Sequence, residues 1–182
     1  MPRRILLDID DTLDRVHGGQ QLSLFHAHHD SRCFLPIHIY EAVTGKPVAV
    51  ILRPGKTPDG AEVAAVLCHV VKAIRRRWPR VEIVIRGDSH YARPEAMNWL
   101  ECNRVRYVLG LAGNRILLDR TAGLAEDAAV RRAEEDADKV RRFHDFRYAA
   151  KSWTGERRVI ARIEATRQGS DTRFICPLNL LD

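Results

Sequence analysis

Carboxylates stand close together near the start of the chain, where residues 4–12 read RILLDIDDT. In a β-strand, residues two apart share a face, so Asp8 and Asp10 point to one side and Asp11 to the other. Two neighbouring carboxylates on a buried strand repel each other and lose hydration, unless they share a cation or a proton. The pattern therefore indicates a functional site more than a purely structural strand.

A further aspartate follows a second strand-like segment. Residues 81–86 (VEIVIR) alternate and are apolar on one side, and Gly87 and Asp88 come directly after them. Open α/β sheets place their sites at the carboxyl ends of their strands, and a glycine lets the backbone turn there. We therefore take Asp88 as the second candidate for chemistry.

Three histidines and an aspartate occur within residues 26–30 (HAHHD). Their spacing matches no closed set of metal ligands, so we interpret the segment as a polar loop or strand edge in preference to a metal site. The four cysteines are scattered without a C-x-x-C pair, which argues against a zinc site and against a disulfide framework. The aspartates remain the strongest candidates.

The overall composition is that of a soluble globular protein with a basic balance of charge. The 182 residues are 45% hydrophobic and 30% charged, which suits one domain, or one domain with an appendage. No apolar run approaches the roughly 20 residues of a membrane helix, and the N-terminus lacks the anatomy of a signal peptide. The net charge of +6 suits a polyanionic partner. We expect a cytoplasmic protein without membrane contact.

The hydrophobic pattern predicts the elements that position these residues. Residues 33–43 and 46–53 are β-rich runs joined by a Thr-Gly turn, which predicts an antiparallel hairpin with Pro36 at an edge or a bulge. Apolar residues at three- and four-residue steps predict a helix over about 58–77. The pattern further predicts a strand at 81–86, a helix at 94–103, a strand at 105–111, a solvated helix at 124–142, and strands at 143–153, 157–166 and 172–178.

One fold that could present the first aspartates is that of a haloacid-dehalogenase-like phosphatase. Its motif D-x-D-x-T would make Asp8 the nucleophile and Asp10 the general acid. That fold needs parallel strands with helical crossovers after the motif, whereas residues 33–53 predict a hairpin. Ala92 also stands where the late motif of that fold requires an acid.

The order strand, hairpin, helix, strand, helix, strand is instead typical of a ribonuclease-H-like fold, an α/β fold with a mixed sheet. Its first three strands are antiparallel, and its fourth lies parallel beside the first. This neighbourhood lets Asp88 approach Asp10. Two carboxylates that meet in this way can bridge two divalent cations, which activate a nucleophile and stabilise the leaving oxygen in an attack on phosphorus.

Three segments carry a resemblance to a known family: LDIDDT-x-D-x-VHGGQQLSLF-x-AH, CFLPIHIYEAVTGKPVAVILRPGKTPDGAEV and RGDSHY-x-RPEAMNW. The chain resembles the DDE transposases of bacterial insertion sequences, above all the subgroup numbered thirteen-eighty, allied to the group numbered four. The resemblance extends from about Leu7 to Cys176. It implies a ribonuclease-H-like catalytic core over residues 1–118. Residues 119–182 would then be a charged helix and the start of a β-rich insertion.

This resemblance implies DNA transposition and recombination as the function. The expected reaction is metal-dependent strand cleavage and transfer at insertion-sequence ends, with double-stranded DNA at the ends and at the target as partner. Mg²⁺ is the expected cofactor and Mn²⁺ a substitute. The expected location is the bacterial cytoplasm, in association with the nucleoid, and a homodimer within a DNA complex is compatible with the family.

The resemblance also assigns roles to residues. By position in the motifs, Asp10 is the first catalytic aspartate and Asp88 the second, and both are implied metal ligands. Asp8 is a same-face neighbour and a further candidate ligand, while Asp11 points to the opposite side and is the weaker candidate. Independently of the resemblance, Lys56, Arg86 and Arg93 are expected phosphate contacts, Lys56 and Arg93 because they lie close to strand ends in the sequence. His90 is expected to orient Asp88 or to contact the DNA backbone.

The third acid of such a catalytic triad has no match in the chain. The resemblance implies a glutamate on a later helix, in a motif like R-G-x-x-E-N, whereas Glu156 and Glu164 belong to the predicted β-rich insertion and Asp182 is the last residue. We therefore expect a truncated catalytic domain without its closing helix, inactive alone because one acid is missing. The alternative is a degenerate, non-enzymatic remnant that binds DNA.

Overall fold

An eight-stranded sheet runs through the molecule, which the computed structural model describes over residues 2–178. In spatial order its strands are β6 (Lys46–Ile51), β5 (Ile37–Glu41), β1 (Arg4–Asp11), β7 (Glu82–Gly87), β8 (Arg106–Leu111), β11 (Gly169–Leu178), β10 (Arg157–Thr166) and β9 (Lys139–Tyr148). A small sheet has the order β2 (Asp14–Arg15), β4 (Ser31–Phe34) and β3 (Leu24–His26). The helices are α1 (Gly60–Arg77), α2 (Pro94–Cys102) and α3 (Arg115–Glu134).

The strand directions are those of a ribonuclease-H-like fold. β1 pairs antiparallel with β5, and β5 pairs antiparallel with β6. On its other side β1 pairs parallel with β7, and β7 pairs parallel with β8. The predicted fold class is therefore confirmed. Because β1 and β7 are parallel neighbours, their carboxyl ends lie at the same edge of the sheet.

Alternation along β1 separates its apolar side chains from its acidic ones. Leu7 and Ile9 are 0% and 2% exposed and belong to the core cluster that includes the apolar sides of α1 and α2. Asp8 and Asp10 point to the other face, because successive side chains of a strand alternate. A shift of one residue would expose the apolar side chains, so their burial specifies the register of β1.

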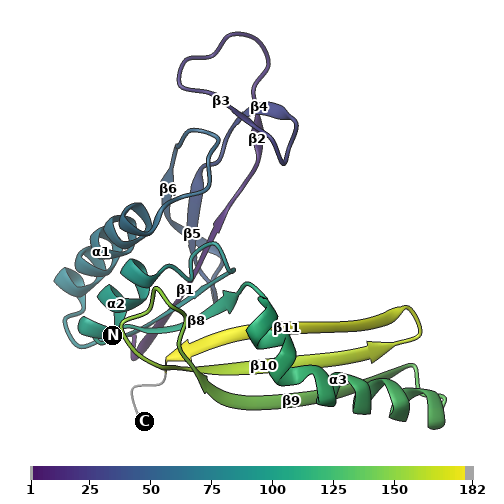
Figure 1. Cartoon of the computed structure of the whole chain (residues 1–182). Coiled ribbons are helices and arrows are strands. Elements are labelled where there is room, and N and C mark those ends of the chain that lie inside the picture. The colour runs from purple at the N-terminus through teal and green to yellow at the C-terminus, as the bar shows by residue number, and fades with distance from the viewer. Residues whose placement is uncertain (1, 179–182) are drawn as a thin grey trace.

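The strand predicted at 33–43 is divided in two. β4 ends at Phe34 in the small sheet, and β5 begins at Ile37 in the main sheet. Pro36 lies at the break because it has no N–H to give to a strand ladder, and its carbonyl oxygen accepts a hydrogen bond from Thr12 N at 3.2 Å. The chain thus leaves the main sheet beside the end of β1, and the small sheet projects there, at the top of Figure 1.

The helix predicted over 124–142 is wrong at both ends. α3 begins at Arg115 and ends at Glu134, and residues 139–142 belong to β9. Every residue of β9 pairs with a residue of β10. Cross-strand pairing therefore outweighs the charge pattern that favours a helix in this segment.

The β-rich part continues the main sheet. β11 pairs antiparallel with β8, β10 with β11, and β9 with β10. α3 packs on these strands around a second apolar cluster that includes Leu117, Val159 and Phe174. In Figure 1, these strands and α3 reach away from α1 and α2. The molecule therefore has two apolar cores along one sheet.

Two glycine substitutions test the close packing at the end of β7. A Cβ on Gly110 would lie 2.9 Å from Ser89 N and 3.3 Å from the Cα of Asp88, whereas a Cβ on Gly123 of α3 would meet nothing within 4 Å. We expect Gly110→Ala to lower the free energy of unfolding by about 1–3 kcal/mol through overpacking. Gly123→Ala should raise it by about 0.5–1 kcal/mol through helix propensity. Urea unfolding measures both, and equal shifts for the two variants would contradict the packing.

Candidate active site

Three aspartates lie at the shared edge of β1 and β7. Asp10 and Asp11 end β1, and Asp88 directly follows β7. A carboxylate oxygen of Asp10 accepts a hydrogen bond from Asp11 N at 2.9 Å, and one of Asp88 accepts a bond from His90 N at 2.8 Å. The parallel pairing of the two strands thus brings together acids that are far apart in the sequence.

A cavity of about 320 Å³ lies between this edge and the small sheet. Its lining residues are Asp11, His26, His28, His29, Leu35, Thr57, Asp88 and His90. Asp11 and Asp88 come from the ends of main-sheet strands, and His26 ends β3 of the small sheet. Although alternation puts Asp11 on the strand face opposite Asp10, the structure brings Asp11 into the same cavity as Asp88.

The carboxylates act on one another electrostatically. Burial raises the pKa of Asp11 above its usual value, and the nearby His90 opposes the rise. The carboxylates of Asp10 and Asp88 raise this pKa further, because like charges disfavour ionisation. The pKa of the fully buried Tyr91 is also raised, first by its burial and then by the same three acids. The edge is therefore a concentrated negative site that a bound cation would neutralise.

A buried arginine supports this region. Arg53 is 3% exposed, and its Nε and Nη2 each lie 2.6 Å from a carboxylate oxygen of Glu62 in α1. Its Nη1 donates to the carbonyl oxygens of Leu35 (3.2 Å) and Lys56 (3.1 Å). Since Leu35 lines the cavity, the pair of Arg53 and Glu62 holds the chain where the small sheet leaves the core.

Asp8 is engaged by Arg86. The Nε and Nη2 of Arg86 lie 2.6 and 2.7 Å from the two carboxylate oxygens, across a register position of β1 and β7. The hydrogen bonds to Asp8 raise the pKa of Arg86. Asp8, expected as a further metal ligand, and Arg86, expected at DNA, thus bind each other. The phosphatase alternative would require Asp8 to leave this pair in order to act as the nucleophile.

The other expected DNA-contacting residues lie at or near the cavity. His90 lines it, and its Nδ1 lies 3.5 Å from a carboxylate oxygen of Asp88. Arg93 donates from Nε to the carbonyl oxygen of His90 at 3.0 Å, which ties it to the loop that carries Asp88. Lys56 is exposed, next to Thr57 in the cavity lining.

The histidines of residues 26–30 line the cavity, although the sequence pattern predicts no functional role for them. Residues 26–30 do form a strand end and a turn, as the polar-loop interpretation expects. That interpretation does not reveal that His26, His28 and His29 line the same cavity as Asp88. The clustering of histidines in the sequence was the available signal for a functional segment, but it does not predict which part of the protein the turn packs against.

The donor set fits a divalent cation in part. Carboxylate oxygens are the ligands that Mg²⁺ and Mn²⁺ prefer, and Mg²⁺ commonly uses one or two of them together with water and substrate phosphate. Within residues 2–178, no group of three histidine, cysteine, aspartate or glutamate side chains is placed to hold a metal ion. Asp10 and Asp88 would therefore hold an ion only together with ligands from water or from a bound phosphate.

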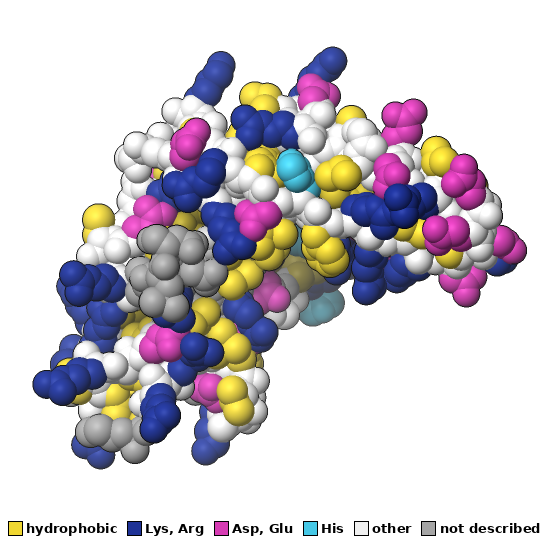
Figure 2. All heavy atoms as spheres, turned by 90° about the horizontal axis from the view of Figure 1, so that it is seen from below, with side chains coloured by type: hydrophobic (Ala, Val, Ile, Leu, Met, Phe, Trp, Pro, Cys, Tyr) yellow, Lys and Arg dark blue, Asp and Glu magenta, His cyan; other side chains and the backbone are white. Residues whose placement is uncertain are grey.

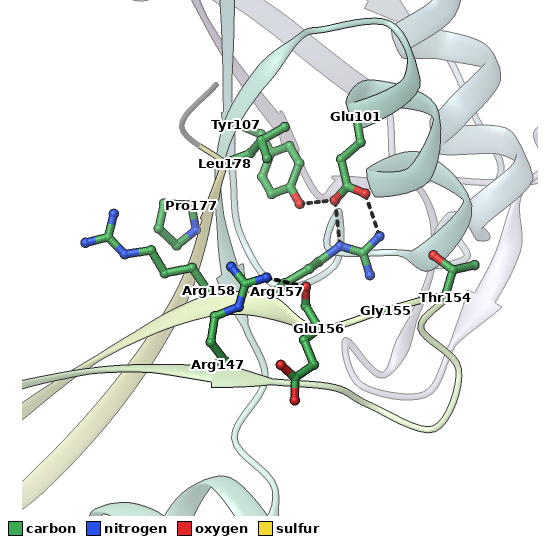
Figure 3. Close-up of a pocket in the computed structure, with 10 residues that line it drawn as sticks. All are labelled: Glu101, Tyr107, Arg147, Thr154, Gly155, Glu156, Arg157, Arg158, Pro177 and Leu178. Atoms are coloured by element: carbon green, nitrogen blue, oxygen red, sulfur yellow. Dashed lines mark hydrogen bonds and ion pairs between the residues drawn. The ribbon is translucent and has the colours of Figure 1, made fainter. Parts of the chain in front are cut away.

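A second cavity, of about 380 Å³, lies where the β-rich part meets the core (Figure 3). Arg157 is 7% exposed there, and its Nε and Nη2 lie 2.6 and 3.0 Å from the carboxylate of Glu101. Nη2 also donates to the side chain of Asn98 at 2.6 Å, and the Tyr107 hydroxyl donates to Glu101 at 2.6 Å. This buried ion pair joins β10 to α2, so we assign it a structural role.

The acids considered for the third catalytic position lie elsewhere. Glu156 lines the second cavity and is not among the residues that line the cavity of Asp88. Glu164 binds Lys139 (3.0 Å) and Arg141 (2.7 Å), and hydrogen bonds from these side chains lower its pKa to about 2. Asp182 lies outside the described residues.

Basic side chains are spread over much of the face seen in Figure 2, while Asp and Glu gather toward the end that α3 and the tips of the long strands form. At that end Asp136 and Asp138 pair with Arg167 at 3.6 and 3.4 Å. The net charge of +6 suits contact with DNA phosphates. None of the described helices is long and apolar enough to cross a membrane.

Comparisons with known proteins connect this geometry to a family. The family model described as transposase DDE domain group 1 matches residues 1–179. A search of curated proteins found no match. Among solved structures, the chain is similar to Ciona intestinalis endonuclease V in complex with a 23mer DNA containing an inosine followed by a ribo-adenosine, with a TM-score of 0.42 and 8% identity over 96% of this chain and 70% of that chain.

Removal of the Glu62 charge tests the support given by Arg53. The hydrogen bond from Arg53 lowers the pKa of Glu62, so the pair stabilises the fold above the unfolded-state pKa of about 4.3 and loses this contribution as the pH falls through the lower folded-state pKa. We expect Glu62→Gln to lower the free energy of unfolding at neutral pH by about 1–3 kcal/mol. The difference from wild type should shrink below about pH 4.

Urea unfolding across this pH range measures the Glu62 effect, with Glu126→Gln on the exposed side of α3 as the matched control. A constant difference between wild type and Glu62→Gln at every pH would contradict the assignment of the effect to the ionised carboxylate.

The pair of Asp8 and Arg86 is testable by a double-mutant cycle. Their side chains are 41% and 50% exposed, so we expect a coupling of only about 0.2–1 kcal/mol between Asp8→Asn and Arg86→Met in the free energy of unfolding. Asp10→Asn removes a like charge from the acidic edge and should not lower stability. A stability loss for Asp10→Asn as large as that for Asp8→Asn would contradict the different roles of the two aspartates.

Proposed function

This chain belongs to the family described as transposase DDE domain group 1, and we propose that it acts on DNA through the acidic edge formed by Asp10 and Asp88. Members of this family of enzymes cut and move DNA. The reaction proposed here is metal-dependent cleavage of a DNA strand and its transfer to a target. The substrates are the ends of an insertion sequence, of the subgroup numbered thirteen-eighty, and its target DNA.

The observation that carries the proposal is the meeting of carboxylates at the ends of two parallel neighbours, β1 and β7. Asp10 and Asp88 would hold divalent cations, with Mg²⁺ as the natural ion and Mn²⁺ as a substitute. When bound, such a pair of cations supplies activation of the attacking oxygen and stabilisation of the leaving oxygen. His90 lies 3.5 Å from Asp88 and orients it.

Basic residues beside the edge would bind the DNA backbone. Arg93 is tied to the loop of Asp88 through the carbonyl oxygen of His90, and Lys56 lies exposed before α1. The bidentate bonds of Arg86 to Asp8 keep this arginine at the edge, where its remaining N–H groups suit a phosphate. We further propose residues 1–118 as the catalytic core and residues 119–182 as the helix and the beginning of the insertion.

The setting that we propose is the bacterial cytoplasm, next to the nucleoid, with a homodimer in the DNA complex. The alternative is a non-enzymatic remnant that only binds DNA. It is favoured by the sequence, in which no glutamate in a motif like R-G-x-x-E-N occurs, and the net charge of +6 suits DNA binding in either case. Metal binding separates the two functions, because a remnant needs no ion at Asp10 and Asp88.

Mn²⁺ binding, followed by electron paramagnetic resonance, tests the ligands directly. Asp10→Asn and Asp88→Asn each remove a charged oxygen ligand, so we expect each to weaken Mn²⁺ binding by about 10- to 100-fold. Asp138→Asn is the matched control, because this aspartate is 92% exposed and far along the sheet. Equal Mn²⁺ affinity in wild type, Asp10→Asn and Asp88→Asn would overturn the proposed metal ligands and favour the remnant.

Strand nicking of a duplex that carries the element ends tests the reaction. Because coupled catalytic residues fail together and the third acid has no match in the sequence, we expect no nicking by this chain with Mg²⁺ or Mn²⁺. Nicking that survives either substitution would contradict the assigned aspartates. Nicking that both substitutions abolish would instead contradict the expectation that the chain lacks a necessary acid.

A further inference from the structure

Three histidines form a compact cluster on the small sheet, which we call the imidazole wall: His26, His28 and His29. His26 ends β3, and the other two lie in the turn before β4. The ring centroids of His26 and His29 are 4.8 Å apart, and those of His28 and His29 are 5.0 Å apart. His29 N donates to the carbonyl oxygen of His26 at 3.1 Å, which closes the turn.

The strands behind the imidazole wall are held by a partly buried hydrogen-bond network. Arg32 of β4 donates from Nη2 to the carbonyl oxygen of Ser23 at 2.8 Å and from Nε to its hydroxyl at 3.3 Å. Ser23 is 3% exposed, and its hydroxyl donates to the carbonyl oxygen of Gln20 at 2.9 Å. This network fixes the approach to β3, so the wall is positioned before any ligand binds.

The imidazole wall lines the same cavity of about 320 Å³ as Asp11 and Asp88, while Asp10 is not among the lining residues. His90 lines this cavity as well. The acids and the wall differ in chemistry, because ionised carboxylates only accept hydrogen bonds whereas each imidazole offers at least one N–H donor. A ligand that fills the cavity therefore meets both cation-binding groups and donors.

The guanidinium of Arg15 acts on the imidazole wall, and one polar atom of the wall has no hydrogen-bond partner among the described residues. Partial burial lowers the pKa of His29, and the nearby rings of His26 and His28 and the guanidinium of Arg15 lower it further. The Nδ1 of His26 is buried and has no hydrogen-bond partner among the described residues. A buried polar atom without a partner is unfavourable, so this ring gains from a turn that offers Nδ1 a hydrogen-bond partner.

These properties favour an anionic oxygen ligand over a cation. The guanidinium of Arg15 repels a metal ion at the wall, and the described residues hold no three side chains placed to ligate one. A DNA strand carries a row of phosphates, so a strand that presents one phosphate to the acidic edge brings its neighbours close. Phosphate oxygens accept hydrogen bonds from neutral as well as protonated imidazoles.

We propose that the imidazole wall binds a DNA backbone phosphate adjacent to the one presented to Asp10 and Asp88. The inference rests on the proposed function, because it takes DNA as the ligand of the cavity. His26, His28 and His29 are then positioning residues. They hold the strand so that the attacked phosphate lies at the acidic edge, and they carry no proton in the reaction.

Methylphosphonate interference tests this inference without catalysis. Duplexes with one neutral methylphosphonate at successive positions are titrated with protein in the absence of divalent metal, and binding is followed by fluorescence anisotropy. Wild type is expected to lose about three- to tenfold affinity at one phosphate that the wall contacts. The triple variant His26→Gln/His28→Gln/His29→Gln should bind the unmodified duplex more weakly and lose nothing further at that phosphate.

Two further variants keep the test independent of folding. His28→Gln changes an exposed side chain and should show a smaller effect at the same phosphate, while His69→Gln on the exposed side of α1 should keep the wild-type profile. If the triple variant loses as much affinity as wild type at every methylphosphonate position, the inference is overturned. Zn²⁺ binding that the triple variant loses, with unchanged DNA profiles, would overturn it in favour of a metal site.

The readout also separates this inference from the proposed function. Mn²⁺ affinity and nicking report on Asp10 and Asp88, whereas the interference profile is recorded without metal and with no strand cut. Absence of the interference effect in wild type, together with Mn²⁺ binding that depends on Asp10 and Asp88, would overturn only the role of the wall. If wild type shows the interference effect but Mn²⁺ binding does not depend on Asp10 and Asp88, only the assignment of these two aspartates as metal ligands is overturned.

Discussion

The parallel pairing of β1 and β7 is the constraint on which the rest of the structure depends. Its register places Ile9 beside Gly87, so β1 continues to Asp10 and Asp11 where β7 ends and Asp88 follows. A Cβ on Gly87 would lie 2.9 Å from the Cγ2 of Ile9, so a glycine leaves room for the Ile9 side chain at this register position. Carboxylates do not attract one another. Backbone pairing and burial of the apolar face of β1 hold them together.

The remaining charges are arranged around this edge so that each has a partner or solvent. Arg86 neutralises Asp8 within the same sheet, and the buried Arg53 is neutralised by Glu62 of α1. Asp11 is left among other acids, and its pKa is raised by burial and by those neighbours. The supporting ion pairs therefore stabilise the fold, while the edge itself retains unneutralised charge that can bind a cation.

Much of the fold follows from local patterns in the sequence. The alternation in residues 4–12, the β-rich hairpin and the apolar spacing of α1 each predict their element, and their order predicts the ribonuclease-H-like sheet. The errors occur where long-range contacts decide. Pro36 divides one expected strand because the chain moves to a second sheet, and residues 139–142 join β9 because β10 pairs with them. Neither neighbour is visible within a short window of sequence.

The sequence by itself determined the family resemblance, the fold class and the two motifs that contain Asp10 and Asp88, since these depend on residue type, spacing and order. Whether those two aspartates hold metal stays a prediction. Tertiary structure alone decided that Asp8 is engaged by Arg86 and that Asp11 shares a cavity with Asp88. It alone placed the imidazole wall in the cavity that Asp11 and Asp88 line. The physical reason is that alternation fixes side-chain directions within one strand only. The cavity is formed by segments far apart in the sequence, and sheet pairing together with the turn at residues 27–30 sets the distances between them.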